Sequence, residues 1–117
     1  MTKDKDLLFL LEPGFVNPAY PNQRFYCWQC ALIEGVLMSF PQLGEHLEVI
    51  RINWPKPRQQ LIDLVGEKNQ KAPLMVLREG ETSAYRNGIY NGRAFINDKH
   101  NILAALAERH AFPHAHP

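Results

Sequence analysis

The sequence predicts an α/β protein in which a four-stranded mixed sheet lies between layers of helices, in the order β-α-β-α-β-β-α. Two observations lead to this prediction. Short apolar runs of strand length alternate with segments of helical period, and prolines, glycines and Asn-Gly pairs separate them. With 117 residues, 45% hydrophobic and 21% charged, the composition is that of an ordinary globular protein. We therefore expect a single domain over residues 1–117.

The first half of the chain is predicted as strand, loop, helix and strand. The run Leu7–Leu11 is continuous and apolar, which is typical of a strand buried on both faces. Residues 12–26 carry three prolines and a glycine, so we expect a long irregular loop. From Cys27 apolar residues recur at helical spacing until Pro41. The segment Leu47–Trp54 is rich in branched residues and predicts the second strand.

The middle of the chain is predicted to supply a helix and a short strand. Pro57 is expected near the first position of the helix, and Leu61, Leu64 and Val65 form its apolar stripe. The apolar run Leu74–Leu77 then predicts the third strand. It is entered through an Ala-Pro pair.

The last third is predicted as a hairpin followed by a covering helix. Two Asn-Gly turn signals lie in residues 78–92, before a fourth strand at Arg93–Ile96. Asn97 or Asp98 then caps a helix. Residues 110–117 contain prolines and are expected to form a frayed tail.

Charge and hydropathy exclude several classes of function. The net charge is +1 and the basic residues are spread along the chain, so no basic patch for nucleic acid or an anionic membrane is predicted. The apolar run near the start is too short for a signal peptide or a membrane span. We therefore expect a cytoplasmic protein, where an isolated structural disulfide does not persist.

The two cysteines of the chain lie together in the stretch RFYCWQC. In a reducing compartment this spacing indicates a redox or metal site. At a helix start, Cys27 faces free backbone N–H groups and the positive end of the helix dipole, and both favour a thiolate. Cys30 lies on the same side of the helix and can close a disulfide with it. Cys27 is thus predicted to attack a disulfide and Cys30 to resolve the intermediate.

Other interpretations of this stretch stay open. The protein can be a non-catalytic binding or redox-sensing module. Two thiolates also supply half of a tetrahedral zinc site, for which five histidines are available. Trp28 offers either an exposed apolar surface for a partner or a core residue beneath the long loop. Arg24 adds positive charge near the thiolate or is simply solvated.

The strand, the C-x-x-C at a helix start and the segment KAPLMVL resemble the thioredoxin-like superfamily, which includes glutaredoxins and the N-terminal domain of glutathione transferases. The resemblance implies a thioredoxin-like three-layer sandwich without a bound cofactor. It also implies thiol–disulfide exchange with a protein or glutathione disulfide, with glutathione as a co-substrate. In that superfamily a cis-proline lies against the cysteine pair and the preceding residue pairs with bound peptide or glutathione. These roles fall on Pro73 and Ala72.

Two further segments carry a resemblance. NGRAFINDKHNILAALAER is similar to the transferase N-terminal pattern, in which an acidic-polar pair holds the γ-glutamyl end of glutathione. Asn97 and Asp98 occupy that place, and the alternative is a helix cap alone. The segment YPNQRFYCWQCALIEGVL also resembles a small bacterial family with an F-Y-C-W-x-C signature. This resemblance implies a thioredoxin-like fold, but no reaction is assigned to that family. The Trp-Gln pair between the cysteines differs from those of thioredoxins and glutaredoxins.

Overall fold

The architecture is that of a mixed sheet flanked by helices. The structure is a computed structural model that describes residues 4–117, so residues 1–3 of the predicted domain lie outside the described residues. The sheet has five strands in the order β2-β1-β3-β5-β4. Its strands are β1 (Asp6–Leu11), β2 (Leu47–Ile52), β3 (Leu74–Val76), β4 (Gly88–Tyr90) and β5 (Arg93–Ile96).

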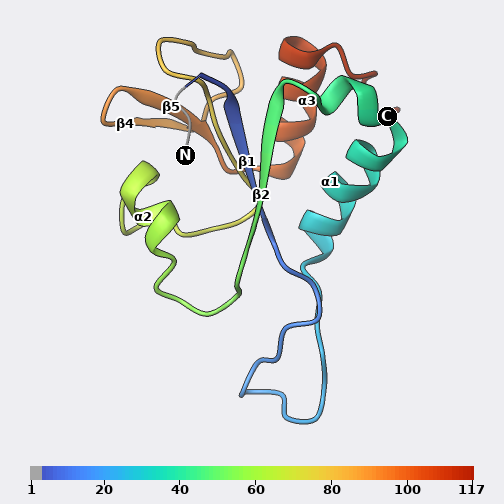
Figure 1. Ribbon diagram of the computed structural model, residues 1–117, viewed down its shortest axis with the longest axis vertical. Coiled ribbons are helices and arrows are strands. Elements are labelled where there is room, and N and C mark those ends of the chain that lie inside the picture. Colours follow the sequence, from blue (N-terminus) through green and yellow to red (C-terminus); the bar gives the residue numbers. More distant parts are fainter. Residues whose placement is uncertain (1–3) are drawn as a thin grey trace.

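The helices lie on both sides of this sheet. Figure 1 shows α1 (Trp28–Ser39) and α3 (Lys99–His110) on one side and α2 (Gln59–Val65) on the other. A 3-10 turn, Pro41–Gly44, joins α1 to β2. None of the helices in the part of the chain that the structure describes is long and apolar enough to cross a membrane.

The prediction of four strands is wrong, because a short edge strand was missed. β4 pairs antiparallel with β5, with Tyr90 opposite Arg93. Between them Asn91 and Gly92 have φ angles of 48° and 81°. These are the left-handed values that both central residues of a tight two-residue hairpin require. The three residues of β4 are too few to show an alternating pattern, so only the turns around them were visible in the sequence.

β1 is an interior strand between β2 and β3, and its register defines one end of the sheet. All six of its residues are buried, as expected. It pairs parallel with β2, Leu11 lying opposite Ile52, and antiparallel with β3, Phe9 lying opposite Leu74. β5 in turn runs antiparallel to β3. The carboxyl ends of β1, β2 and β5 and the amino end of β3 therefore meet at one end, called here the site end.

Among the element boundaries that differ from the prediction, two lie beside the site end. β2 stops at Ile52, so Trp54 leaves the strand and becomes available to the long loop. α2 begins at Gln59 with Arg58 as its N-cap residue, so Pro57 lies before the helix instead of at its first position. Trp54 stacks on Phe15 and Arg58 bonds to Gln70. Contacts between residues so far apart in the chain leave no trace in the periodicity of the sequence.

The C-terminal residues pack further than their prolines suggested. His110 is the last residue of α3 and not the first of a tail. Phe112 is 3% exposed and packs edge-to-face against Phe40, with ring centroids 6.1 Å apart. Burial of this ring stabilises the ordered backbone around it. The packed part of the chain thus reaches Phe112.

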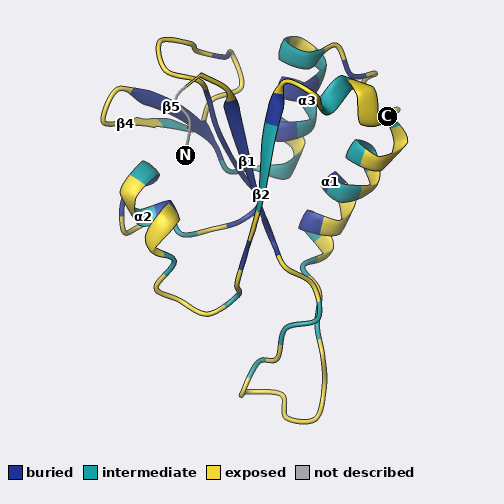
Figure 2. Ribbon diagram, in the orientation of Figure 1, coloured by how far each residue is buried: buried dark blue, intermediate teal, exposed yellow. Residues whose placement is uncertain are grey.

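Burial is concentrated in the sheet and on the helix faces that cover it (Figure 2). The buried apolar residues form a hydrophobic cluster to which every strand except β4 contributes. The segment between β1 and α1 projects beyond the site end and is mostly exposed (Figures 1 and 2). We call residues 12–26 the projecting loop.

Candidate functional site

Cys27 is the N-cap residue of α1, at the site end of the sheet. Its backbone is extended, and its Sγ accepts a hydrogen bond of 3.2 Å from the backbone N–H of Cys30. The sulfur thus takes the place that a serine or aspartate oxygen usually occupies at a helix N-terminus. An N–H bond of this kind is stronger to a charged acceptor than to a neutral one. Cys27 is partly exposed, so the geometry offers a capped sulfur that solvent and substrate can reach.

Cys30 has a different environment three residues further on. It is only 2% exposed, and the backbone N–H of Leu11 donates to its Sγ at 3.4 Å. Burial, together with a hydrogen bond to the sulfur of Cys27, raises the pKa of Cys30 to about 12. Both cysteines are free thiols. The pair therefore combines a reachable sulfur with a buried sulfur that keeps its proton at neutral pH.

Trp28 follows Cys27 and lies on the surface. Its side chain is 60% exposed, so the interpretation as a core residue beneath the loop is wrong. The Nζ of Lys99 lies 5.0 Å from the centre of its ring, which is cation–π distance. Because Lys99 opens α3, this contact brings the amino ends of α1 and α3 together beside the cysteines.

Ala72 and Pro73 precede β3 and therefore lie at the same end of the sheet. Both are buried, and the peptide bond between them is cis, the isomer that the resemblance implies. Ala72 lines a cleft together with Leu11, the residue whose N–H contacts Cys30. The backbone before Pro73 is thus next to the end of β1, whose Leu11 contacts the buried sulfur.

Asn97 and Asp98 follow β5 and complete this end. Asp98 is the N-cap of α3, and its carboxylate accepts a 3.0 Å hydrogen bond from the N–H of Asn101. The N–H of Asn97 donates to Oδ1 of Asn87 at 2.9 Å. Asp98 therefore makes the helix cap that the sequence left between two residues. The structure gathers all seven residues singled out from the sequence at the site end.

Arg58 is a functional candidate that sequence reasoning missed. Its guanidinium donates to the carbonyls of Trp54 and Gln70, each at 2.6 Å, which fixes the position of its charge. Burial lowers the pKa of Arg58, whereas the sulfurs of Cys30 and Cys27 act in the opposite direction. The charge thus lies within electrostatic reach of both. No local pattern indicates this, because Arg58 comes from the approach to α2.

Arg24, the cation considered from sequence, has another role. It is exposed, and its Nη1 donates to the carbonyl of Gly14 at 2.6 Å, across the base of the projecting loop. A β-bridge between Phe15 and Phe25 closes the same base. Phe15 also stacks on Trp54, with centroids 5.5 Å apart and planes 7° apart. These three contacts therefore fix the base of the projecting loop beside the cysteines.

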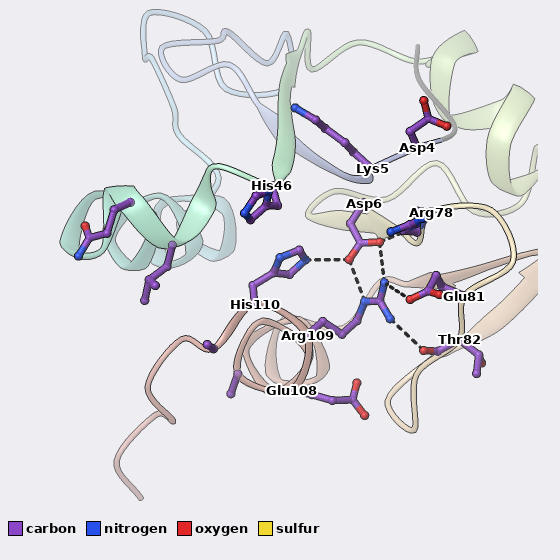
Figure 3. A pocket seen from close by; sticks show the side chains of 14 residues that line it. Asp4, Lys5, Asp6, His46, Arg78, Glu81, Thr82, Glu108, Arg109 and His110 are labelled. Atoms are coloured by element: carbon purple, nitrogen blue, oxygen red, sulfur yellow. Dashed lines mark hydrogen bonds and ion pairs between the residues drawn. The ribbon is translucent and has the colours of Figure 1, made fainter.

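A large hollow lies at the opposite end of the sheet. It measures about 1030 Å³ and surrounds Asp6 at the start of β1 (Figure 3). The Asp6 side chain is 1% exposed and accepts bonds from Arg109 and His110, both at 2.8 Å, and from the N–H of Arg78. Burial by itself raises the pKa of Asp6, but these bonds together outweigh it and hold the pKa well below its usual range. The Asp6 carboxylate therefore serves to hold β1, α3 and the segment after β3 together.

A metal site would need further ligands near the two sulfurs. Among residues 4–117, no group of three or more histidine, cysteine, aspartate or glutamate side chains is placed to hold a metal ion. Of the tail histidines, His110 is hydrogen-bonded to Asp6 at the end of the sheet far from the cysteines. The arrangement of the cysteines is thus that of a thiol pair.

Comparison with known proteins relates the chain to a family. A family model described as "Protein of unknown function (DUF3088)" matches residues 5–114. No curated protein and no solved structure matches the chain. The match spans every strand and helix described above, including both cysteines.

Proposed function

The chain belongs to the DUF3088 family, and from its site we propose that the protein is a thiol–disulfide oxidoreductase. One observation carries the proposal. The reachable sulfur of Cys27 accepts the backbone N–H of Cys30, while the Cys30 sulfur next to it is buried and has a raised pKa. A nucleophilic thiolate beside a protonated resolving thiol is what sequential disulfide exchange needs.

We further propose that four of the strands form a thioredoxin-like core. Three features support this assignment. The unit β1-α1-β2 is parallel, β3 runs antiparallel to β1 and to β5, and α3 returns to the side that α1 covers. The thiol pair opens the helix after β1, and the Ala72–Pro73 bond precedes β3, which lies beside β1 in the sheet. In this assignment β4 is an added edge strand.

The proposed reaction proceeds in two balanced steps. The Cys27 thiolate attacks one sulfur of the substrate disulfide, whose S–S bond breaks as a mixed disulfide forms, and the departing thiolate takes a proton from solvent. Cys30 then loses its proton and attacks the sulfur of Cys27. This releases the second substrate thiolate and leaves a Cys27–Cys30 disulfide, so two electrons pass to the substrate. Glutathione or another thiol then reduces the protein.

The N–H groups near the pair support both steps. The Cys30 N–H holds the Cys27 sulfur in place for attack. The Leu11 N–H points at the Cys30 sulfur and stabilises its charge when the proton leaves. The raised pKa keeps Cys30 protonated until the mixed disulfide has removed the charge of its neighbour. Trp28, exposed beside Cys27, offers a flat apolar surface to the substrate.

Reduction of a small neutral disulfide by the two single serine variants tests the proposal. Cys27→Ser should abolish turnover, because the reachable sulfur is gone. Cys30→Ser should complete only the first step, so a mixed disulfide at Cys27 accumulates and is seen as an added mass. Circular dichroism checks that both variants fold. If wild type fails to react with any disulfide while Cys27 alkylates freely, the protein is instead a binding or sensing module.

A further inference from the structure

The cleft beside the thiol pair is lined by basic residues and by no acidic residue. It measures about 450 Å³ and is lined by Leu11, Trp54, Lys56, Arg58, Lys71 and Ala72. Half of these residues are cations and none is an acid. A cavity of this size holds a small ligand or a few residues of a peptide. The overall net charge of +1 gives no hint of such a local excess.

The two lysines of the cleft are available to a ligand. Lys56 and Lys71 are exposed, and among residues 4–117 no carboxylate forms an ion pair with either of them. Arg58 differs, because its guanidinium is already bonded to the carbonyls of Trp54 and Gln70. The lysines can therefore bind an anion directly, and Arg58 adds a fixed positive charge behind them.

The cleft adjoins the buried sulfur through Leu11, which lines the cleft and contacts Cys30. The Leu11 backbone N–H contacts the Cys30 Sγ at 3.4 Å, and Arg58 interacts electrostatically with both cysteines. A ligand held by the lysines would thus place its neighbouring atoms near Cys27. The buried backbone of Ala72 forms another wall.

We infer that the pair acts on acidic disulfides, in which carboxylates flank the S–S bond and bind Lys56 and Lys71. This inference rests on the proposed function and names its substrate class. Three cations around one cleft attract a carboxylate and repel an ammonium group, and with low salt such fields change association rates by about tenfold or more. The ligand is either a small acidic disulfide or an acidic peptide segment.

Single-turnover kinetics with three small disulfides test the inference. Reduced protein is mixed at low ionic strength with oxidised glutathione, which is acidic, hydroxyethyl disulfide, which is neutral, and cystamine, which is cationic. Each rate is divided by that of dithiothreitol, a neutral dithiol, with the same disulfide, which removes intrinsic reactivity. Wild type should prefer oxidised glutathione over cystamine by about tenfold or more, and added salt should reduce this preference. A longer acidic peptide disulfide distinguishes the two sources of substrate.

Charge variants decide whether the cleft is responsible. K56Q/K71Q should lose most of the preference, and K56E/K71E should reverse it. Lys68→Gln is the matched control, because Lys68 is an exposed lysine outside the cleft and should leave the preference unchanged. Equal corrected rates in wild type, or an equal loss in the Lys68→Gln variant, would overturn the inference.

A binding measurement separates this inference from the proposed function. The Cys27→Ser variant cannot exchange disulfides, so calorimetry with oxidised glutathione reports recognition alone. Adding K56Q/K71Q to it should weaken binding several-fold. If binding depends on the lysines but wild type reduces no disulfide, the redox proposal fails and acid recognition stands. If wild type reduces every disulfide without regard to charge, the redox proposal stands and the inference fails.

Discussion

At the scale of single residues, the pair is asymmetric because of where the helix begins. Cys27 caps α1 from outside its first turn, so its sulfur stays at the surface. Cys30, three residues on, already faces the sheet and is 2% exposed. The same spacing that brings the sulfurs together therefore separates their environments, and hence the two roles in the proposed exchange.

This asymmetry predicts selective alkylation. Iodoacetamide at neutral pH should modify Cys27 in the native protein and leave Cys30 unmodified, because burial and the hydrogen bond to Cys27 raise the pKa of Cys30 to about 12. The sign follows from the thiolate being the reactive form, so labelling of Cys30 should increase only in strongly alkaline solution. Peptide mass spectrometry measures each site. Urea-unfolded protein, in which both sites should react alike, is the control, and equal labelling in the native state would contradict the prediction.

At the scale of elements, the projecting loop is held by aromatic contacts in place of regular structure. Phe15 stacks on Trp54 and lies 6.1 Å from Phe25, which Tyr20 meets edge-on at 5.8 Å. Trp54 also separates the basic cleft from a second hollow of about 430 Å³ along the loop. A small aromatic cluster thus positions the loop next to Cys27.

Removal of the Phe15 ring should release this loop without unfolding the sheet. Aromatic pairs contribute about 0.5–1.5 kcal/mol beyond their buried area, so Phe15→Ala should increase local opening by roughly tenfold. Limited trypsin cleavage after the exposed Arg24 measures the opening. Val16→Ala is the control, since Val16 is 59% exposed and its truncation should leave cleavage unchanged. Equal cleavage of wild type and Phe15→Ala would show that the ring does not hold the loop.

At the scale of the whole molecule, Asp6 connects the beginning and the end of the described chain. Its carboxylate accepts hydrogen bonds from Arg109 and His110, which close α3, and from the N–H of Arg78 after β3. Arg109 in turn pairs with Glu81 at 3.3 Å. Figure 3 shows these contacts around Asp6. Asp6 begins β1, whereas Leu11, which contacts Cys30, ends it, so the contacts support the fold at the end opposite the thiol site.

Asp6→Asn should destabilise the protein in a pH-dependent way. Removing one partner of a buried ion pair costs about 3 kcal/mol, because Arg109 loses its buried countercharge and keeps only the exposed carboxylate of Glu81. The folded-state pKa of Asp6 is lowered, so its stabilisation is fully present above the unfolded-state value near 4 and is lost as the pH falls toward the lowered value. Urea denaturation at neutral and acid pH should therefore show a difference between wild type and variant that shrinks below about pH 4.

The exposed Asp63 provides the control for this measurement. It accepts a surface hydrogen bond from Gln59, so Asp63→Asn should change the free energy of unfolding little at any pH. A difference for Asp6→Asn that stays constant as the pH falls would show that packing, and not charge, is what the residue contributes.

Much of the fold could be predicted because most of its elements have a pattern in their own local sequence. The apolar β1, the helical period after Cys27 and the Asn91–Gly92 turn were all identified before any tertiary information. β4 could not, since three partly exposed residues at a sheet edge have no pattern of their own. The burial of Phe112 against Phe40 likewise depends on a partner far away in the chain.

The sequence by itself determined the placement of the thiol pair: at a helix start after a buried strand, with an Ala-Pro pair before another strand. Only the tertiary structure decided its surroundings. Arg58, Lys56 and Lys71 reach the pair's vicinity because β2 and the approach to α2 end beside β1 and β3. Trp28 is exposed because Lys99, and not the projecting loop, lies against its ring. Periodicity records which residues a helix or strand buries, whereas the charge around a site depends on which strand ends the sheet brings together.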